Sequence, residues 1–289
     1  MFLSPKRIVL IYQMGRVASV AIEQALNQHL KSNIGVIHTH GLSETLQGYY
    51  KEMKTSLSCS QNMKNDAKNY FLFIHRVKKY ILINKIINNE IFIYSGVRNS
   101  ISHSLSCFFH NLYHFFPSYD CLKNDNERAF ESLKNIYFGM LNLRIKNDLI
   151  SQSYHARYFS YYMCLAKDFF DIEFNGVLKT NIYKYTFDKN KNYLEFKHNN
   201  NNFFIYKYEF FNNLQKELDC FIPENLKKNK ITFNKVNSNN DKEISNIYNF
   251  FIKNIKYNDE QLNFLLDNKY MKHFYSDLEI NNLYKKWSN

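Results

Sequence analysis

The order of apolar and polar positions along the chain predicts an α/β fold. Three apolar runs have the length and continuous hydrophobicity of buried parallel strands, and stretches with helical spacing follow them. Three strand–helix units within the first 117 residues are typical of a central parallel sheet flanked by helices. We place the strands at residues 8–14, 34–40 and 90–98, and the helices at 17–31, at 76–89 and from Asn99 or Ser100 onward.

The rest of the chain is predicted to be mainly helical, apart from one hairpin. Residues 126–175 and the C-terminal third have helical spacing, whereas 51–66 is predicted to be a loop or an irregular helix. Two alternating stretches flank an Asn-rich turn at 199–202, which predicts a pair of strands. Because no repeat or linker divides the sequence, we expect a single domain over residues 1–289, with extra C-terminal helices.

Composition and charge narrow the class of protein only slightly. The chain has 45% hydrophobic and 17% aromatic residues, as a folded globular protein does. Its formal net charge of +12 suits an anionic ligand, a nucleic acid or an acidic membrane surface. Abundant Asn, Lys and Ile indicate an AT-rich bacterial genome, which by itself raises the lysine count. We find no motif for recognising RNA or DNA, so nucleic acid is not an expected partner.

Cysteine spacing and hydropathy predict a cytoplasmic protein. The five cysteines include no C-x-x-C pair, which argues against a zinc cage or a disulfide framework and favours a reducing compartment. The apolar stretch near the N-terminus has only about five residues, too few for a signal peptide. No run approaches the roughly 20 apolar residues that cross a bilayer.

The turn after the first strand, QMGRVASV, has the features of a phosphate site. Gly15 lets the backbone approach a ligand closely, Arg16 adds a guanidinium and Ser19 adds a hydroxyl. The helix that begins here presents unpaired N–H groups over residues 17–20 and the positive end of its dipole. An ordinary strand-to-helix turn that binds nothing explains this stretch, taken alone, equally well.

Two common nucleotide-binding fingerprints do not fit this turn. A Walker P-loop, G-x-x-x-x-G-K-[ST], needs a second glycine and a lysine followed by Ser or Thr, and both are missing. The dinucleotide fingerprint G-x-G-x-x-G is missing as well. ATP and NAD are therefore disfavoured as ligands.

Two further strand ends carry candidate site residues. Arg98 follows the third strand, which we expect to neighbour the first, and ligands of open α/β sheets bind at the carboxyl ends of the strands. His38 and His40 end the second strand and, as alternate residues, point to one face of it. Imidazole can take a proton from a hydroxyl near neutral pH, although a histidine pair on a strand often serves only packing.

The helix after the third strand is predicted to have a polar stripe of Ser106, His103, His110 and His114. Histidines four residues apart on a helix can bind zinc, but the glutamate of a metalloprotease motif is absent, so we expect no metal site. One of these histidines could instead face a ligand pocket.

These residues resemble the sulfotransferase superfamily. Its loop for the 5′-phosphosulfate group has a basic residue and then Ser or Thr, and GRVASV is similar to the PKTAST-type loop of the 2-O-sulfotransferase branch. Val20 stands where that loop has Ser or Thr, and Gly15 stands where it has Pro. The superfamily binds the 3′-phosphate of its donor with an Arg at a strand end and a Ser eight residues later, as in Arg98 and Ser106.

The 2-O-sulfotransferase branch also has an H-x-H in its catalytic centre, which IHTH resembles. This resemblance implies His40 as the base and His38 as its partner or substitute. Over most of its length the chain resembles bacterial sulfotransferase-like proteins of capsular polysaccharide synthesis. In IYKYEFF, Lys207 and Glu209 resemble that family's Arg-x-Glu, outside the catalytic step.

The resemblance implies a P-loop-like sulfotransferase fold and an enzyme that moves a sulfuryl group from 3′-phosphoadenosine 5′-phosphosulfate to a hydroxyl of a capsular or surface glycan. It implies a catalytic role for Arg16, no required metal, and a peripheral place at the inner membrane beside the capsule assembly machinery.

The acceptor pocket is expected in residues 41–75 and 110–165. Transfer of another phosphate-type group and a non-catalytic polyanion-binding module remain alternatives. The implied donor-binding residues are Gly15, Arg16, Val17, Ala18, Ser19, Val20, Arg98 and Ser106.

Overall fold

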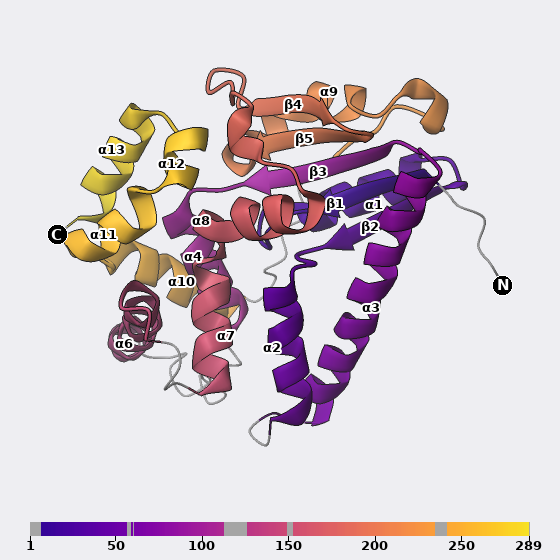
Figure 1. Ribbon diagram of the computed structural model, residues 1–289. Helices are drawn as coiled ribbons and strands as arrows, with labels where there is room; N and C mark the ends of the chain where they lie inside the picture. The colour runs from indigo at the N-terminus through magenta and orange to yellow at the C-terminus, as the bar shows by residue number, and fades with distance from the viewer. Residues whose placement is uncertain are drawn as a thin grey trace. The chain divides into compact units, whose positions relative to one another are not determined.

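The computed structural model has an α/β architecture with one five-stranded central sheet flanked by helices (Figure 1). The expectation of a single domain over residues 1–289 stays a prediction. The structure describes residues 7–56, 59, 61–112, 126–148, 153–234 and 242–288. The chain divides into two compact units, the first made of residues 1–98 and 169–236 and the second of 99–168 and 237–289.

The sheet belongs to the first unit and is parallel except at one edge. Only β4 runs antiparallel, because a short turn joins it directly to β5. The three predicted strands, the hairpin and the pairing of β1 with β3 are confirmed, although the hairpin turn is shorter than 199–202. In spatial order the strands are β2 (Ile34–Thr39), β1 (Arg7–Tyr12), β3 (Ile91–Val97), β5 (Asn201–Lys207) and β4 (Tyr193–His198).

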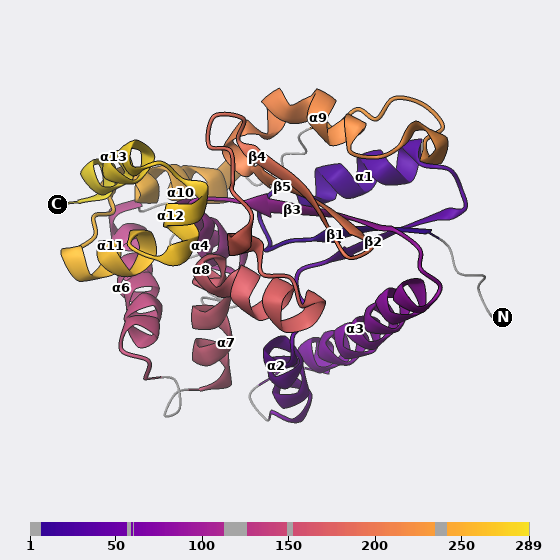
Figure 2. The same cartoon turned by 45° about the horizontal axis from the view of Figure 1, so that its top comes forward.

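Helices cover both faces of this sheet, with α1 and α9 on one face and α2 and α3 on the other (Figure 2). Val9 and Ile11 of β1 belong to the apolar core under α1 and α9. The alternate residue Tyr12 faces the other way and stacks on Phe174 of η2, with ring centroids 5.4 Å apart. These elements are α1 (Ser19–His29), α2 (Glu44–Thr55), α3 (Gln61–Ile86), η2 (Phe170–Leu178), η3 (Ile182–Lys184), η4 (Tyr208–Leu214), α9 (Gln215–Cys220) and η5 (Glu224–Leu226).

The prediction of a loop or irregular helix over 51–66 is wrong for 51–55 and 61–66, which are regular helix. Regular helix α2 continues to Thr55, and α3 begins at Gln61 and runs for 26 residues, well beyond the predicted 76–89. Tyr50 and Tyr70 stack with ring centroids 5.3 Å apart, so the two helices support each other. The polar residues that suggested a loop belong to helix faces exposed to solvent, which need no apolar periodicity.

The second unit is helical, as predicted for the middle and the C-terminal third of the chain. Its core is aromatic, with ring centroids 5.1 Å apart for Phe109 and Phe251 and 5.3 Å apart for Phe108 and Tyr137. Among the described helices, none combines the length and the apolar character that crossing a bilayer requires. The helices of this part are α4 (Ser100–His110), α6 (Asn126–Ile145), α7 (Tyr154–Met163), α8 (Leu165–Phe169), α10 (Lys242–Asn254), α11 (Asp259–Leu266), α12 (Lys269–Phe274) and α13 (Asp277–Trp287).

Candidate functional site

The segment between β1 and α1 is a strained turn. Arg16 and Ala18 both have left-handed backbone conformations, with φ of 69° and 66°. Such a conformation costs an L-residue about 1–2 kcal/mol. Gly15, where the sequence predicts the turn, does not have a positive φ. Arg16 and Ala18, on either side of Val17, make the turn instead. Strain of this kind persists only where surrounding structure holds it, and it gathers at ligand sites.

A buried glutamine, Gln13, holds this turn in place. Its Nε2 donates to Val17 O at 3.3 Å, and its Oε1 accepts from the backbone N–H of Gly96 at 2.8 Å. The Tyr206 hydroxyl lies 2.6 Å from Val17 O and 3.0 Å from Gln13 Oε1, and its one proton serves one of them at a time. Burial raises the pKa of Tyr206, so the phenol remains a donor at any ordinary pH.

Gly96 lies inside β3 and not in a turn, and the close packing under the loop explains why a glycine is needed there. A Cβ atom at this position would come within 2.9 Å of both the Tyr206 hydroxyl and the Val17 side chain. Real Cβ atoms do not approach their neighbours so closely, so any larger residue would displace the loop. The three residues Gln13, Gly96 and Tyr206 are parts of the site that the sequence reasoning did not assign.

Helix α1 begins at Ser19 without a side-chain cap, since Ala18 has no side chain that could accept a hydrogen bond. The first N–H groups of a helix have no partner within the helix, so they are available to an anion in front of it. Gly15, Val17 and Ser19 are buried and Arg16 is half-buried. The side chain of Val20 is exposed, so this residue can contribute only its backbone N–H.

Arg98 lies against the same loop, as expected from the pairing of β1 and β3. Its Nη1 donates to Arg16 O at 3.2 Å, and its guanidinium stands over the Tyr208 ring at 4.8 Å from the centroid. Lys207, fully buried at the end of β5, pairs in register with Val97. Three cationic residues, Arg16, Arg98 and Lys207, therefore lie at or just after the ends of three adjacent strands, at the edge where open α/β sheets bind ligands.

Ser106, the expected partner of Arg98, is half-buried on α4 in the second unit, and its role stays a prediction. The predicted polar stripe is wrong for His103, which is completely buried, whereas His110 is exposed. Eight of the 11 residues of α4 are buried, so the helix has only a narrow solvent face and His103 falls outside it. His114 lies outside the described residues.

His38 and His40 lie together on one face at the end of β2, as predicted, with ring centroids 4.6 Å apart. His38 Nδ1 lies 2.8 Å from Glu23 Oε2, and His40 Nδ1 lies 3.1 Å from Gln13 O. Because a carbonyl oxygen only accepts, His40 must have its proton on Nδ1, which leaves the lone pair of the neutral ring on Nε2. A general base needs a nitrogen in this state, held by a partner behind it.

A buried carboxylate, Glu173 of η2, holds the segment that follows His40. Its Oε2 accepts from the backbone N–H groups of Leu42 at 2.6 Å and Ser43 at 2.9 Å, and from the hydroxyl of Tyr12. Glu173 is 1% exposed, so these three donors replace the water that the carboxylate loses. Glu173 shares its apolar helical stretch with Asp171, and no spacing in the sequence distinguishes the two.

Replacing Glu173 with Ala is expected to lower the free energy of unfolding by about 3 kcal/mol, because two buried N–H groups and a phenol lose a charged acceptor. Urea denaturation at neutral pH measures the change. The control is Glu209→Ala, which removes an exposed glutamate and should stay within about 0.5 kcal/mol of the parent. A Glu173→Ala value no larger than that of the control would show that the carboxylate does not hold the loop.

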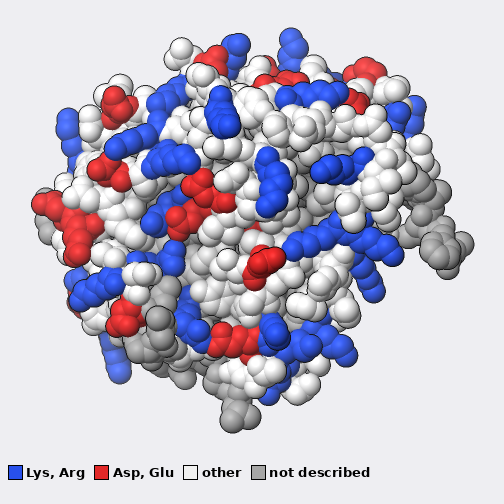
Figure 3. Space-filling model, viewed as in Figure 1, with Lys and Arg blue, Asp and Glu red and all other residues white. Residues whose placement is uncertain are grey.

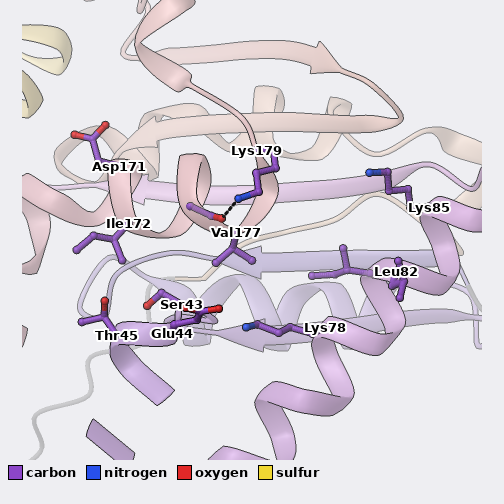
Figure 4. Close-up of a pocket in the computed structure, with 12 residues that line it drawn as sticks. Ser43, Glu44, Thr45, Lys78, Leu82, Lys85, Asp171, Ile172, Val177 and Lys179 are labelled. Atoms are coloured by element: carbon purple, nitrogen blue, oxygen red, sulfur yellow. Dashed lines mark hydrogen bonds between the residues drawn. The ribbon is translucent and has the colours of Figure 1, made fainter. Parts of the chain in front are cut away.

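A cavity of about 630 Å³ opens next to this segment, between the start of α2, the side of α3, and η2 (Figure 4). Its charged lining residues are Lys78, Lys85, Lys179, Glu44 and Asp171. The acceptor pocket was expected in residues 41–75 and 110–165, and only the residues from the start of α2 fall within those ranges. Lys78 and Lys85 come from α3 and Lys179 follows η2, and no pattern in the sequence predicts that these elements share a cavity.

The carboxyl edge of the sheet brings together the strained loop before α1, two arginines and a histidine whose Nδ1 is held by a backbone carbonyl. Gln13 connects them, because its side chain holds the loop and its carbonyl oxygen holds His40. Comparisons of the chain with models of protein families, with curated proteins and with solved structures find no match.

Proposed function

We propose that the protein is a sulfotransferase with the P-loop-like fold of that superfamily, which moves a sulfuryl group from 3′-phosphoadenosine 5′-phosphosulfate to a hydroxyl of a carbohydrate, a capsular or surface glycan. The observation that carries the proposal is the 3.2 Å contact between Arg98 and the backbone of Arg16. The two basic positions that the resemblance assigns to the 3′-phosphate and the 5′-phosphosulfate lie side by side, 82 residues apart in the chain.

In this proposal the donor's two phosphate ends have separate binding groups. Arg16 and the backbone N–H groups of residues 17–20 hold the 5′-phosphosulfate and offset the negative charge that grows on the leaving phosphate. Arg98 holds the 3′-phosphate, a group that ATP lacks. The left-handed residues and the uncapped start of α1 support this assignment, because such backbone leaves N–H donors for an anion.

His40 acts on the acceptor. Its Nε2 takes the proton from the sugar hydroxyl while the hydroxyl oxygen forms a bond to sulfur, and the bond between sulfur and the 5′-phosphate oxygen breaks. The products are the sulfate ester and 3′,5′-ADP, and the proton passes from His40 to solvent. His38, whose Nδ1 lies 2.8 Å from Glu23 Oε2, supports the ring of His40 from the side.

A thermal-shift comparison of 3′,5′-ADP, ADP and AMP tests the donor. A ligand at 100 times its Kd stabilises the folded state by about 2.7 kcal/mol, so a clear rise in Tm is expected with 3′,5′-ADP and a smaller one with the other two. An equal response to all three would refute the proposal. Selective stabilisation by ADP would favour transfer of a different phosphate-type group, and a response only to polyanions, with steep salt dependence, would favour a binding module.

A further inference from the structure

The cavity beside the His40 segment has a lining that combines three kinds of group. Lys78 and Lys85 of α3 and Lys179 after η2 contribute amines, and Glu44 and Asp171 contribute carboxylates. Figure 4 also shows Leu82 and Val177 between these charged side chains, with Val177 pointing into the space. A ligand that matches such a wall carries anionic groups for the lysines, hydroxyl donors for the carboxylates and C–H surface for the apolar residues.

The two lysines of α3 are available to a ligand. In the part of the chain that the structure describes, no carboxylate lies within ion-pair distance of Lys78 or Lys85. Helix α3 has six basic residues and one acidic residue, and basic side chains lie over it in Figure 3. The Nζ of Lys179 donates to Gly176 O at 2.8 Å, which places that amine at the cavity and leaves two of its N–H groups for a ligand.

The spacing of the α3 lysines sets the kind of anion. Residues 78 and 85 are seven positions apart, so they lie on one face of the helix about 10 Å apart along its axis. Leu82 stands between them on that face. To hold one small anion together, the two lysine side chains would have to bend toward each other over Leu82, whereas an oligosaccharide with acid groups on separate sugar units meets both amines as they stand and lays a ring face on Leu82.

The cavity lies next to the chain segment that follows His40, the proposed base. Ser43 lines the cavity three residues after His40, and Glu173 fixes its backbone N–H. We infer that the cavity binds the acceptor as an acidic oligosaccharide, a stretch of glycan with carboxylate groups on separate sugars. Its role as acceptor site rests on the proposed function, but the binding itself does not.

Isothermal titration calorimetry with three probes tests this inference: a trimer of galacturonic acid, the neutral trisaccharide maltotriose, and citrate. We expect the uronate trimer to bind at least about 10-fold more tightly than either of the others, since only its spaced carboxylates make charge-assisted contacts with separate lysines. Citrate binding as tightly as the uronate would show a simple anion site and overturn the inference. Maltotriose binding as tightly would overturn it as well.

A pair of double variants locates the site. Lys78→Gln with Lys85→Gln is expected to weaken uronate binding about 10-fold or more. The matched control, Lys68→Gln with Lys79→Gln, removes the same charge from exposed positions of the same helix outside the cavity lining and should leave Kd within about 2-fold. An equal loss in both double variants would mean that only the general charge of α3 attracts the ligand, and would overturn the inference.

The same variants separate this inference from the proposed function. Lys78→Gln with Lys85→Gln should keep the full thermal response to 3′,5′-ADP, whereas Arg16→Ala should lose it and still bind the uronate trimer. If the protein binds the uronate trimer but none of the three nucleotides raises its Tm, the cavity's role as an oligosaccharide site is supported and the sulfotransferase proposal is rejected. A response to 3′,5′-ADP with no uronate binding would reject the cavity alone.

Discussion

Arg16→Ala is expected to reduce sulfuryl transfer by about 10²–10³-fold, the usual loss when a preorganised donor to developing charge is removed. The guanidinium is the full positive charge of the loop between β1 and α1, and it stands where the resemblance places the leaving phosphate. The fold should survive, because Arg98 bonds to the backbone oxygen of Arg16 and alanine keeps that atom. Product formation with labelled donor measures the rate, and circular dichroism checks the fold.

Two further variants make this test sharper. Arg76→Ala removes an exposed arginine of α3 and should leave the rate unchanged. Arg16→Gly removes the guanidinium together with the left-handed strain at φ 69°, so it should be as slow as Arg16→Ala but equally or more stable. Near-normal turnover in Arg16→Ala would disprove the role of the loop.

His40→Ala is expected to slow turnover by about 10²–10⁴-fold, the range for loss of a general base. Affinity for 3′,5′-ADP should not change, because the imidazole acts on the acceptor and not on the nucleotide. His38→Ala should cost less, since its ring supports His40 and its Nδ1 is held by Glu23. Steady-state rates together with the thermal response to 3′,5′-ADP separate these effects.

His75→Ala, which removes an exposed imidazole of α3, is the control for this series and should be as active as the parent. A larger loss in His38→Ala than in His40→Ala would transfer the role of base to His38. Full activity in both variants would leave the site without a base and contradict the mechanism.

Much of the sheet could be predicted because its signals are local. A buried parallel strand shows as a continuous apolar run, and the chain has three such runs before residue 98. The region over 51–66 was mispredicted for the opposite reason, since helix faces exposed to solvent carry no apolar pattern. His103 was misplaced because the burial of α4 depends on the helices around it, which no spacing within 11 residues reveals.

The sequence by itself determined that the loop after β1, the end of β2 and Arg98 would share one edge of the sheet. Parallel strands that are connected through helices bring their carboxyl ends to the same side, so strand order alone gathers these residues. Only the tertiary structure decided how they are held. Gln13 meets Tyr206 across 193 positions of the chain, and Glu173 meets Leu42 across 131. Contacts at such separations have no local period, so they exist only once the sheet and its covering helices have formed.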